Sequence, residues 1–155
     1  ANTFTDDEQG INDIDEVLRQ RRVTPSVIVH RGHSTHVDRT LEKLPATTAL
    51  VYLGNCGGNT LLDTVLRQAP TAHIITTRGI GTITINDPLL KAWNTYLLRG
   101  KDLTWPHFWR HLEATLGRHA RFIDYVPPDK NASVVFLRAY HRLTAEAKPA
   151  VARAQ

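Results

Sequence analysis

Short apolar runs alternate with segments of helical periodicity along most of the chain. Three runs rich in β-branched residues, bounded by glycine, proline or polar residues, predict buried strands. These runs cover residues 26–30, 49–53 and 72–77. Apolar residues at helical spacing predict helices between and after the strands. We expect helices over residues 11–22, 37–44, 61–68, 86–100 and 104–116, and a last segment, 132–143, that is either one helix or a strand followed by a helix.

This alternation predicts an α/β fold with a mostly parallel sheet flanked by helices. The length of 155 residues corresponds to one domain. We therefore expect a flexible acidic lead-in over residues 1–10, a single domain over 11–145 and a flexible tail over 146–155. In such sheets a ligand binds outside the carboxyl ends of the strands, so the loops after the first two strands are the first candidates for a site.

Composition narrows the function classes. Hydrophobic residues make up 41% of the chain and charged residues 22%, which excludes a disordered, collagen-like or coiled-coil body. The 19 Lys and Arg outnumber the 15 Asp and Glu, but the basic residues are scattered and not interleaved with aromatic residues. We therefore expect no nucleic-acid partner. No apolar run approaches the roughly 20 residues of a membrane helix, so we expect no membrane partner.

The single cysteine excludes an internal disulfide and favours a reducing, cytoplasmic compartment. The first ten residues have neither the basic nor the apolar stretch of a signal peptide, so we do not expect them to be one. The sequence contains no methionine, so we expect a processed chain or a portion of a larger polypeptide or complex. A Walker loop is lacking, and the lone Gly79-Ile80-Gly81 is too weak a signal for a dinucleotide. The sequence therefore predicts no cofactor.

Cys56 lies where the second strand ends and a helix is expected to begin. Gly57 and Gly58 allow the backbone to turn sharply, and Asn55 is expected to shape the turn. Backbone amides that open a helix favour negative charge, so they promote the thiolate and can hold an oxyanion. The alternative is a structural cysteine that belongs to the core.

Three histidines follow the first strand in the stretch VIVHRGHSTH. A thiol nucleophile needs a base within hydrogen-bond reach, and loops that leave neighbouring parallel strands can meet. His33 is best placed, because Gly32 frees the turn and the residue lies just beyond the strand. His30 is the second candidate, although it can still belong to the strand, and His36 lies nearer the next helix. Surface or capping roles are the alternative for each.

Metal binding is a further interpretation of the histidines. His30, His33 and His36 could supply ligands together with Asp38. Their even spacing supports this only on a helix, and the glycine and the preceding strand argue against one. A second pair, His107 and His111, has helical spacing but lacks the intervening glutamate of the HExxH motif. A metal-dependent hydrolase is therefore our third choice of function, and we expect no metal.

The order of these motifs resembles the caspase–hemoglobinase group of cysteine peptidases, which includes caspases, gingipains, separases and CHAT-type proteases. VIVHRGHS is similar to the group's strand that ends at a His-Gly motif, and ALVYLGNCGG to the strand that ends before the nucleophilic cysteine. The later stretch ending in YLLRGK is similar to the CHAT pattern. The resemblance covers residues 26–117. It departs from the pattern in three respects. Gly32 precedes His33 instead of following it, and the gap of 23 residues from His33 to Cys56 is shorter than in most CHAT examples and closer to separase-like spacing. Only one helix is expected before the histidine strand, where members of the group usually have a further strand and helix.

The resemblance implies a caspase-like, three-layer α/β/α fold and a peptide or protein substrate. Cys56 would attack the peptide carbonyl to form a thioester, with proton transfer by His33 or, as second choice, His30. Backbone amides of Cys56 and Gly57 and one from the histidine loop would stabilise the oxyanion. The remaining alternative is a catalytically inactive caspase-like domain that serves as an interaction or scaffold module.

Substrate side chains could be recognised at two positions. Asp87 lies where the CHAT pattern has an acidic residue, although Asn86-Asp87-Pro88 is equally a helix-capping sequence, which we favour. Arg78, beside a strand end, could instead recognise a carboxylate. The sequence does not choose between the two.

Overall fold

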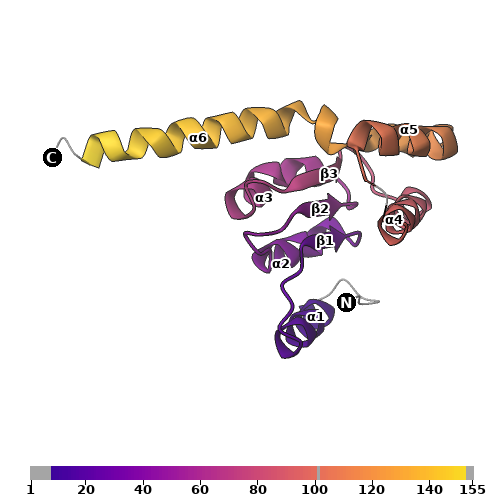
Figure 1. Cartoon of the computed structure of the whole chain (residues 1–155), viewed down its shortest axis with the longest axis horizontal. Coiled ribbons are helices and arrows are strands. Elements are labelled where there is room, and N and C mark those ends of the chain that lie inside the picture. The colour runs from indigo at the N-terminus through magenta and orange to yellow at the C-terminus, as the bar shows by residue number, and fades with distance from the viewer. Residues whose placement is uncertain (1–7, 101, 153–155) are drawn as a thin grey trace.

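The computed structural model describes residues 8–100 and 102–152, which form a four-stranded sheet with helices on both of its faces (Figure 1). The strands are β1 (Val27–His30), β2 (Leu50–Leu53), β3 (His73–Thr77) and β4 (Tyr125–Val126). The helices are α1 (Glu8–Gln20), α2 (Val37–Glu42), α3 (Leu62–Gln68), α4 (Ile83–Leu98), α5 (Trp105–Leu116) and α6 (Ala132–Ala152). Short 3₁₀ turns η1 (Ser34–His36), η2 (Gly58–Leu61), η3 (Ala120–Asp124) and η4 (Pro128–Lys130) complete the chain.

The sheet has the order β1-β2-β3-β4. The first three strands are parallel, and β4 runs antiparallel to β3. This confirms the predicted α/β class with a mostly parallel sheet. The sequence analysis did not predict β4, because two residues are too short to show a period of alternation.

Alternate side chains of the central strands build two hydrophobic cores, one on each face of the sheet. Val51, Leu53 and Ile74 are fully buried and pack against α2, α3 and the start of α6. On the other face, Tyr52 and Ile75 pack against α4 and α5. Both faces of β2 and β3 are therefore covered, which explains why their sequences are continuously apolar.

The beginning of α4 corrects a prediction. Asn86-Asp87-Pro88 was expected to start this helix, but the helix begins at Ile83, with Thr82 as the preceding cap residue. Asn86 is buried and bonds to tyrosine hydroxyls and a strand-end carbonyl, so its side chain serves tertiary contacts and not the helix terminus. Pro88 lies inside the helix. The cap interpretation of Asp87 is therefore wrong.

Helices at both ends of the described chain extend into segments that were expected to be flexible. The first helix begins at Glu8, inside the expected lead-in, and the last helix continues to Ala152, inside the expected tail. The rest of the lead-in and residues 153–155 lie outside the described residues. The segment expected as one helix or a strand followed by a helix is one helix, and Figure 1 shows it extending beyond the body of the molecule.

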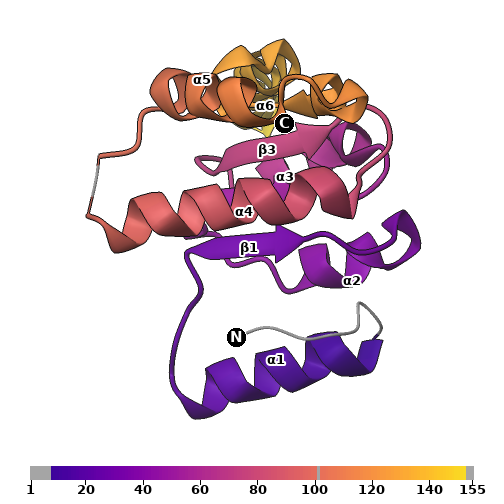
Figure 2. The same ribbon diagram turned by 90° about the vertical axis from the view of Figure 1, so that its right-hand side faces the viewer.

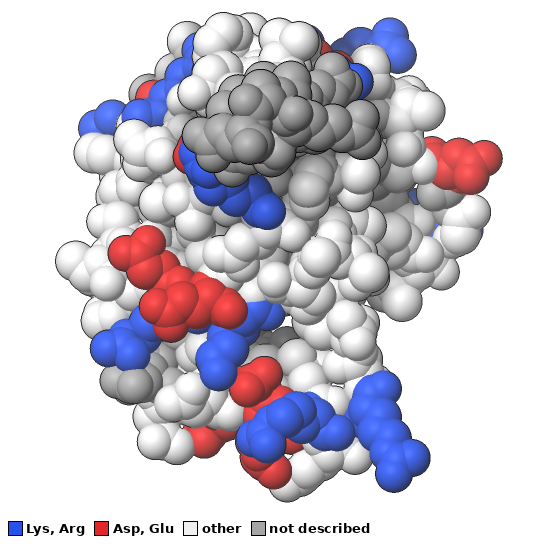
Figure 3. Space-filling view, turned by 90° about the vertical axis from the view of Figure 1, so that its left-hand side faces the viewer, with Lys and Arg blue, Asp and Glu red and all other residues white. Residues whose placement is uncertain are grey.

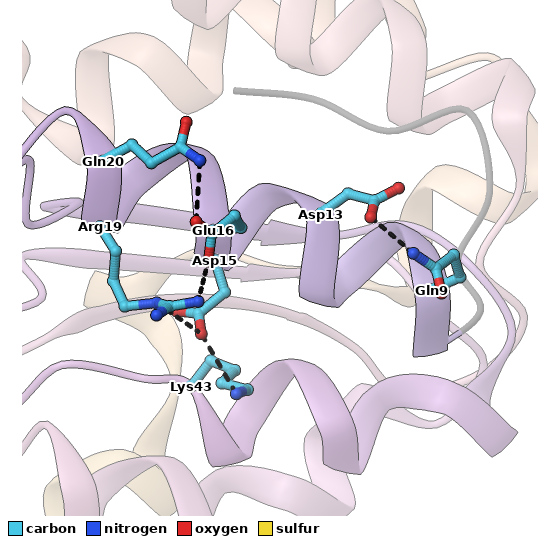
Figure 4. Close-up of polar contacts among 7 residues, drawn as sticks. All are labelled: Gln9, Asp13, Asp15, Glu16, Arg19, Gln20 and Lys43. Atoms are coloured by element: carbon cyan, nitrogen blue, oxygen red, sulfur yellow. Dashed lines mark hydrogen bonds and ion pairs between the residues drawn. The ribbon is translucent and has the colours of Figure 1, made fainter.

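Helix α1 lies away from the sheet and next to α2, as Figures 1 and 2 show. It is strongly amphipathic, and Ile11, Ile14 and Leu18 on its apolar side are only half-buried. Polar contacts along the helix, and the Lys43–Asp15 ion pair that ties it to the end of α2, are drawn in Figure 4. Charged residues of both signs lie side by side over this part of the molecule (Figure 3).

Strand β1 forms an open end of the sheet within the described residues. Val27 and Val29 are 37% and 39% exposed, whereas the side chains of β2 are all buried. None of the described helices is both long and apolar enough to cross a membrane.

Candidate active site

The register of β1 and β2 determines where the candidate dyad lies. His30 is paired with Leu53 at the carboxyl ends of the two parallel strands. His33 and Cys56 each follow these partners by three residues, so they leave the same edge of the sheet from neighbouring strands. Both are exposed. This edge is where the ligand crevice of an open α/β sheet is expected.

The turn that carries Cys56 is closed by a left-handed glycine. Gly57 has a φ of 66°, a conformation that glycine adopts without strain. Its amide donates to the Gly79 carbonyl at 2.8 Å, and its carbonyl accepts from the amide and hydroxyl of Thr60 at 3.0 and 2.9 Å. The resemblance implies that the Gly57 amide belongs to an oxyanion hole, but in the structure this amide fixes the turn.

Thr77, the last residue of β3, anchors the same turn from the other side. Its hydroxyl donates to the Asn55 carbonyl and accepts from the Gly58 amide at 3.2 Å. Asn55 is only 2% exposed, and its amide group donates to the Cys56 carbonyl at 3.2 Å. The predicted role of Asn55 in shaping the turn is thus provided by a local side-chain bond, while the thiol itself projects to solvent.

A buried polar network holds the residue at the end of β2. Asn86 donates to the Gly54 carbonyl at 3.0 Å. Its side-chain oxygen accepts from the hydroxyls of Tyr52 and Tyr125 at 2.6 and 2.7 Å. Tyr125 also accepts from the Thr82 amide at 2.9 Å. The network joins β2, β4 and the start of α4 directly behind the cysteine turn.

Burial keeps both phenols of this network neutral. It raises the pKa of Tyr52 well above the usual value, and the neighbouring Tyr125 acts in the same direction. The pKa of Tyr125 is also raised, first by burial and to a smaller extent by the charges of Asp124 and Cys56. Both hydroxyls therefore remain hydrogen-bond donors over the physiological range, and Tyr125 lies within electrostatic range of the candidate nucleophile.

The glycines after β3 allow the next loop to approach the cysteine turn closely. A Cβ on Gly81 would lie 1.9 Å from the Gly54 carbonyl oxygen, and one on Gly79 would lie 2.7 Å from an oxygen of the Asp124 carboxylate. No side chain fits at Gly81 without displacing the backbone that precedes the cysteine. These two positions are therefore part of the architecture of the site.

His30 is placed as a support for the histidine loop. It is 4% exposed, with Nδ1 2.8 Å from the Thr40 hydroxyl and Nε2 3.1 Å from the His33 carbonyl oxygen. A neutral ring that donates from Nε2 and accepts at Nδ1 satisfies both contacts. Because both ring nitrogens are engaged, we assign His30 a positioning role and keep His33 as the candidate base.

Two backbone amides beside the candidate dyad have no acceptor in the described part of the chain. They belong to Gly32, in the histidine loop, and to Cys56 itself. The thiol of Cys56 likewise has no hydrogen-bond partner among the described residues. The residues of the candidate dyad thus share one edge of the sheet without a hydrogen bond from the thiol to the imidazole.

The two candidate substrate-binding residues differ in their surroundings. Asp87, on the first turns of α4, forms an ion pair with Arg31, and each side chain is 48% exposed. Arg31 directly follows β1, so this pair links the histidine loop to α4. Arg78 directly follows β3, is exposed, and makes no ion pair within the described residues.

The proposed metal ligands do not assemble. Residues 8–100 and 102–152 contain no group of three or more His, Cys, Asp or Glu side chains that could hold a metal ion. His30 is turned to Thr40 and the His33 carbonyl, away from a shared centre. Nothing in the described residues supports a metal-dependent hydrolase.

Sequence reasoning missed most of the residues that support the site. Thr77, Tyr52 and Tyr125 carried no motif and were assigned only to strands or to no element. Gly79 and Gly81 were considered only as a dinucleotide-binding signal that is too weak to use. Arg31 lies within the quoted motif VIVHRGHS, but its partner on α4 could not be inferred from spacing.

We compared the chain with protein-family models, curated proteins and solved structures, and none of them matches it.

Proposed function

We propose that this chain is a cysteine endopeptidase domain of caspase-like fold. The observation that carries the proposal is the register of β1 and β2, which gives His33 and Cys56 matched positions beyond the same edge of the sheet. Two further features support it. The cysteine turn is fixed by bonds to β3 and to the loop after it, and the thiol is exposed.

The proposed reaction begins when the Cys56 thiol transfers its proton to His33 and the thiolate attacks the carbonyl carbon of a peptide bond. The carbon–nitrogen bond then breaks, and the imidazolium returns its proton to the leaving amine. A thioester links Cys56 to the acyl part of the substrate. Water, deprotonated by His33, hydrolyses this thioester and restores the free thiol.

The unpaired amides of Gly32 and Cys56 are the donors that we assign to the oxyanion. Both lie at the ends of neighbouring strands, and neither has an acceptor in the described residues. Donors that are fixed before the reaction stabilise developing negative charge without reorganisation. In this assignment the Gly32 amide takes the role that the resemblance gave to the Gly57 amide. It also gives a function to the glycine that precedes His33.

The substrate in this proposal is a peptide or protein, and Arg78 and Asp87 are its candidate recognition residues. The Arg31–Asp87 ion pair must open before Asp87 can bind a basic side chain, whereas Arg78 is available to a carboxylate. The single cysteine supports a cytoplasmic location, because the chain needs no oxidising compartment to fold. A larger polypeptide or complex would bring the substrate to this edge.

The decisive experiment measures the rate at which iodoacetamide alkylates Cys56 in the parent chain, in His33→Ala and in His36→Ala. At about pH 6.5, we expect His33→Ala to be alkylated at least about tenfold more slowly than the parent chain, because the base that generates the thiolate is lost. His36→Ala is the matched control and should react like the parent. Cleavage of a peptide library, abolished by Cys56→Ala, would then establish the activity.

A second candidate, a catalytically inactive caspase-like interaction or scaffold domain, is favoured by one observation. The Cys56 thiol makes no hydrogen bond among the described residues, so no imidazole holds it in a reactive geometry there. This candidate predicts equal alkylation rates in the parent chain and in His33→Ala. Equal rates together with no library cleavage would replace the peptidase proposal with the scaffold.

A further inference from the structure

A groove of about 450 Å³ runs between α4 and α5, two helices that Figures 1 and 2 show on the side of the molecule opposite the free end of α6. From α4 it is lined by Pro88, Lys91, Ala92, Thr95, Tyr96 and Arg99. From α5 it is lined by His111, Thr115 and Leu116. A second hollow of about 470 Å³ continues it past Tyr96 to His107 and Arg110.

The groove has the dimensions of a short helix. Its α4 wall runs from Pro88 to Arg99, which corresponds to about three turns and about 16 Å. Tyr96 stands between the two helices, with its ring centroid 5.3 Å from that of Phe108 and 5.8 Å from that of His111. These ring contacts hold the two walls apart at a fixed spacing, so the groove is a built feature of the α4–α5 packing.

The floor of the groove is apolar and its rims are basic. Ala92, Leu116 and the ring of Tyr96 provide the apolar surface. Lys91 and Arg99 stand on one rim, and no Asp or Glu lines either hollow.

Two carboxylates on these helices are already engaged elsewhere. On α4, Asp87 pairs with Arg31, and on α5, Glu113 pairs with Lys130 at 3.9 Å. Among the described residues, Lys91, Arg99 and Arg110 make no ion pair. The cations that line the groove are therefore not neutralised by an ion pair within the described residues.

We propose that the groove between α4 and α5 is a docking site for an acidic amphipathic helix of another protein. The apolar side of that helix lies on Ala92, Leu116 and the Tyr96 ring, and its carboxylates reach the cations on the rims. A groove between two helices accepts a third helix through anchors at helical spacing. The complementary charge accelerates encounter and sets the orientation.

A nucleic acid fits these observations less well. Binding of single strands uses aromatic rings whose faces are open to the bases, together with cations that follow the backbone. Here the Tyr96 ring is engaged by contacts with the rings of His107, Phe108 and His111. The apolar floor matches aliphatic side chains, and we therefore assign the site to a peptide.

The test uses fluorescence anisotropy with a labelled peptide of about 16 residues, in which Glu and Leu recur at helical spacing. A peptide of the same composition in shuffled order and a peptide with Lys in place of Glu are measured in parallel, as is a single-stranded RNA. The protein is the full chain and its variants Arg99→Glu, Arg110→Glu and Arg142→Glu. The last variant makes the same charge change on an exposed residue of α6 and is the matched control.

The expected result is binding of the amphipathic peptide that weakens at least about tenfold in Arg99→Glu and in Arg110→Glu but not in Arg142→Glu. Circular dichroism melting confirms that the variants are folded. Three outcomes would overturn the proposal: no binding of the acidic peptide, equal binding of the shuffled peptide, or equal weakening by all three variants. Binding of the RNA alone, lost in Arg99→Glu, would assign the groove to nucleic acid instead. The test does not depend on Cys56 and is unaffected by the outcome of the peptidase experiment.

Discussion

His33 and Cys56 occupy matched positions on two paired parallel strands, each three residues beyond the pair formed by His30 and Leu53. The pairing continues one residue further, because the Gly54 amide donates to the His30 carbonyl at 2.8 Å. The strand ends are therefore held together up to the residues that precede both loops. Reactivity at this edge depends on how firmly each loop is fixed, which leads to the first two predictions.

Gly57 and Gly100 provide a matched pair of substitutions. Both have positive φ, 66° and 59°, and both leave open space for a Cβ. Alanine at either position should lower the free energy of unfolding by about 1 kcal/mol, because an L residue is strained in the left-handed region. Only Gly57→Ala should slow alkylation of Cys56. Urea unfolding and the alkylation rate check this, and slower alkylation in Gly100→Ala would contradict it.

Thr40 orients the histidine loop through His30. Replacing Thr40 by Val removes the donor to Nδ1 of the buried ring, so the free energy of unfolding should fall by about 1 kcal/mol. Thr64→Val, on the exposed side of α3, is the control and should be close to neutral. Urea unfolding at neutral pH measures both. An equal effect of the two substitutions would show that the Thr40–His30 bond contributes nothing.

Removing either tyrosine hydroxyl of the network behind the cysteine turn should lower the free energy of unfolding, but by different amounts. Tyr125→Phe leaves the Thr82 amide without its acceptor, whereas Tyr52→Phe removes one bond to an Asn86 oxygen that keeps a second donor. We expect losses of about 2 and about 1 kcal/mol in the free energy of unfolding. Denaturant unfolding of both variants checks the order, and a larger loss in Tyr52→Phe would refute it.

Alkaline pH tests the same network. The pKa values of Tyr52 and Tyr125 are raised above the usual 10.0 by burial. The neutral phenols are therefore favoured in the folded state, and their contribution is complete below pH 10 and declines as the pH rises above it. Stability should fall above about pH 10, and the fall should be shallower in Tyr52→Phe. Equal slopes in the parent chain and in the variant would exclude Tyr52 as the source.

Acid pH tests the contact between α3 and α6. Asp63 accepts from Arg67 and from His141, each at 2.7 Å, and both bonds hold its pKa below the usual 3.8. The charged carboxylate therefore stabilises the folded state above pH 3.8, and this contribution is lost as the pH falls through the lowered pKa. Asp63→Asn should lower the thermal midpoint at neutral pH but not in strong acid. Asp129→Asn, at an exposed carboxylate, is the control.

The elements that the sequence predicted are those with a strong period of apolar residues. The strands β2 and β3 and the helices between the strands are of this kind, since their apolar residues belong to the two cores. The predicted start of α4 was wrong. Asn86 and Pro88 have the local pattern of a helix cap, but the buried partners of the Asn86 side chain come from β2 and β4. A short sequence motif cannot show which residues of distant strands will contact it in the folded chain.

The same distinction applies to the site. Parallel strands place His33 and Cys56 at one edge by geometry alone, so the sequence was sufficient to bring them together. The support from Thr77 and Tyr125 arises from residues distant in sequence whose types are common in any strand. The supporting position of His30 could be seen only in the structure, because its burial and its bond to Thr40 depend on residues beyond the local motif.

The open side of β1 has a consequence for handling the protein in concentrated solution. Val27–His30 contains neither proline nor lysine, the residues that natural proteins use to prevent an end strand from recruiting a foreign one. Its outward backbone groups are a template for pairing with another chain, and the exposed side chains of Val27 and Val29 favour such contact. The exposed side chain of Val29 can therefore be changed without touching the buried His30, and Val29→Lys should raise the concentration at which the protein stays in solution.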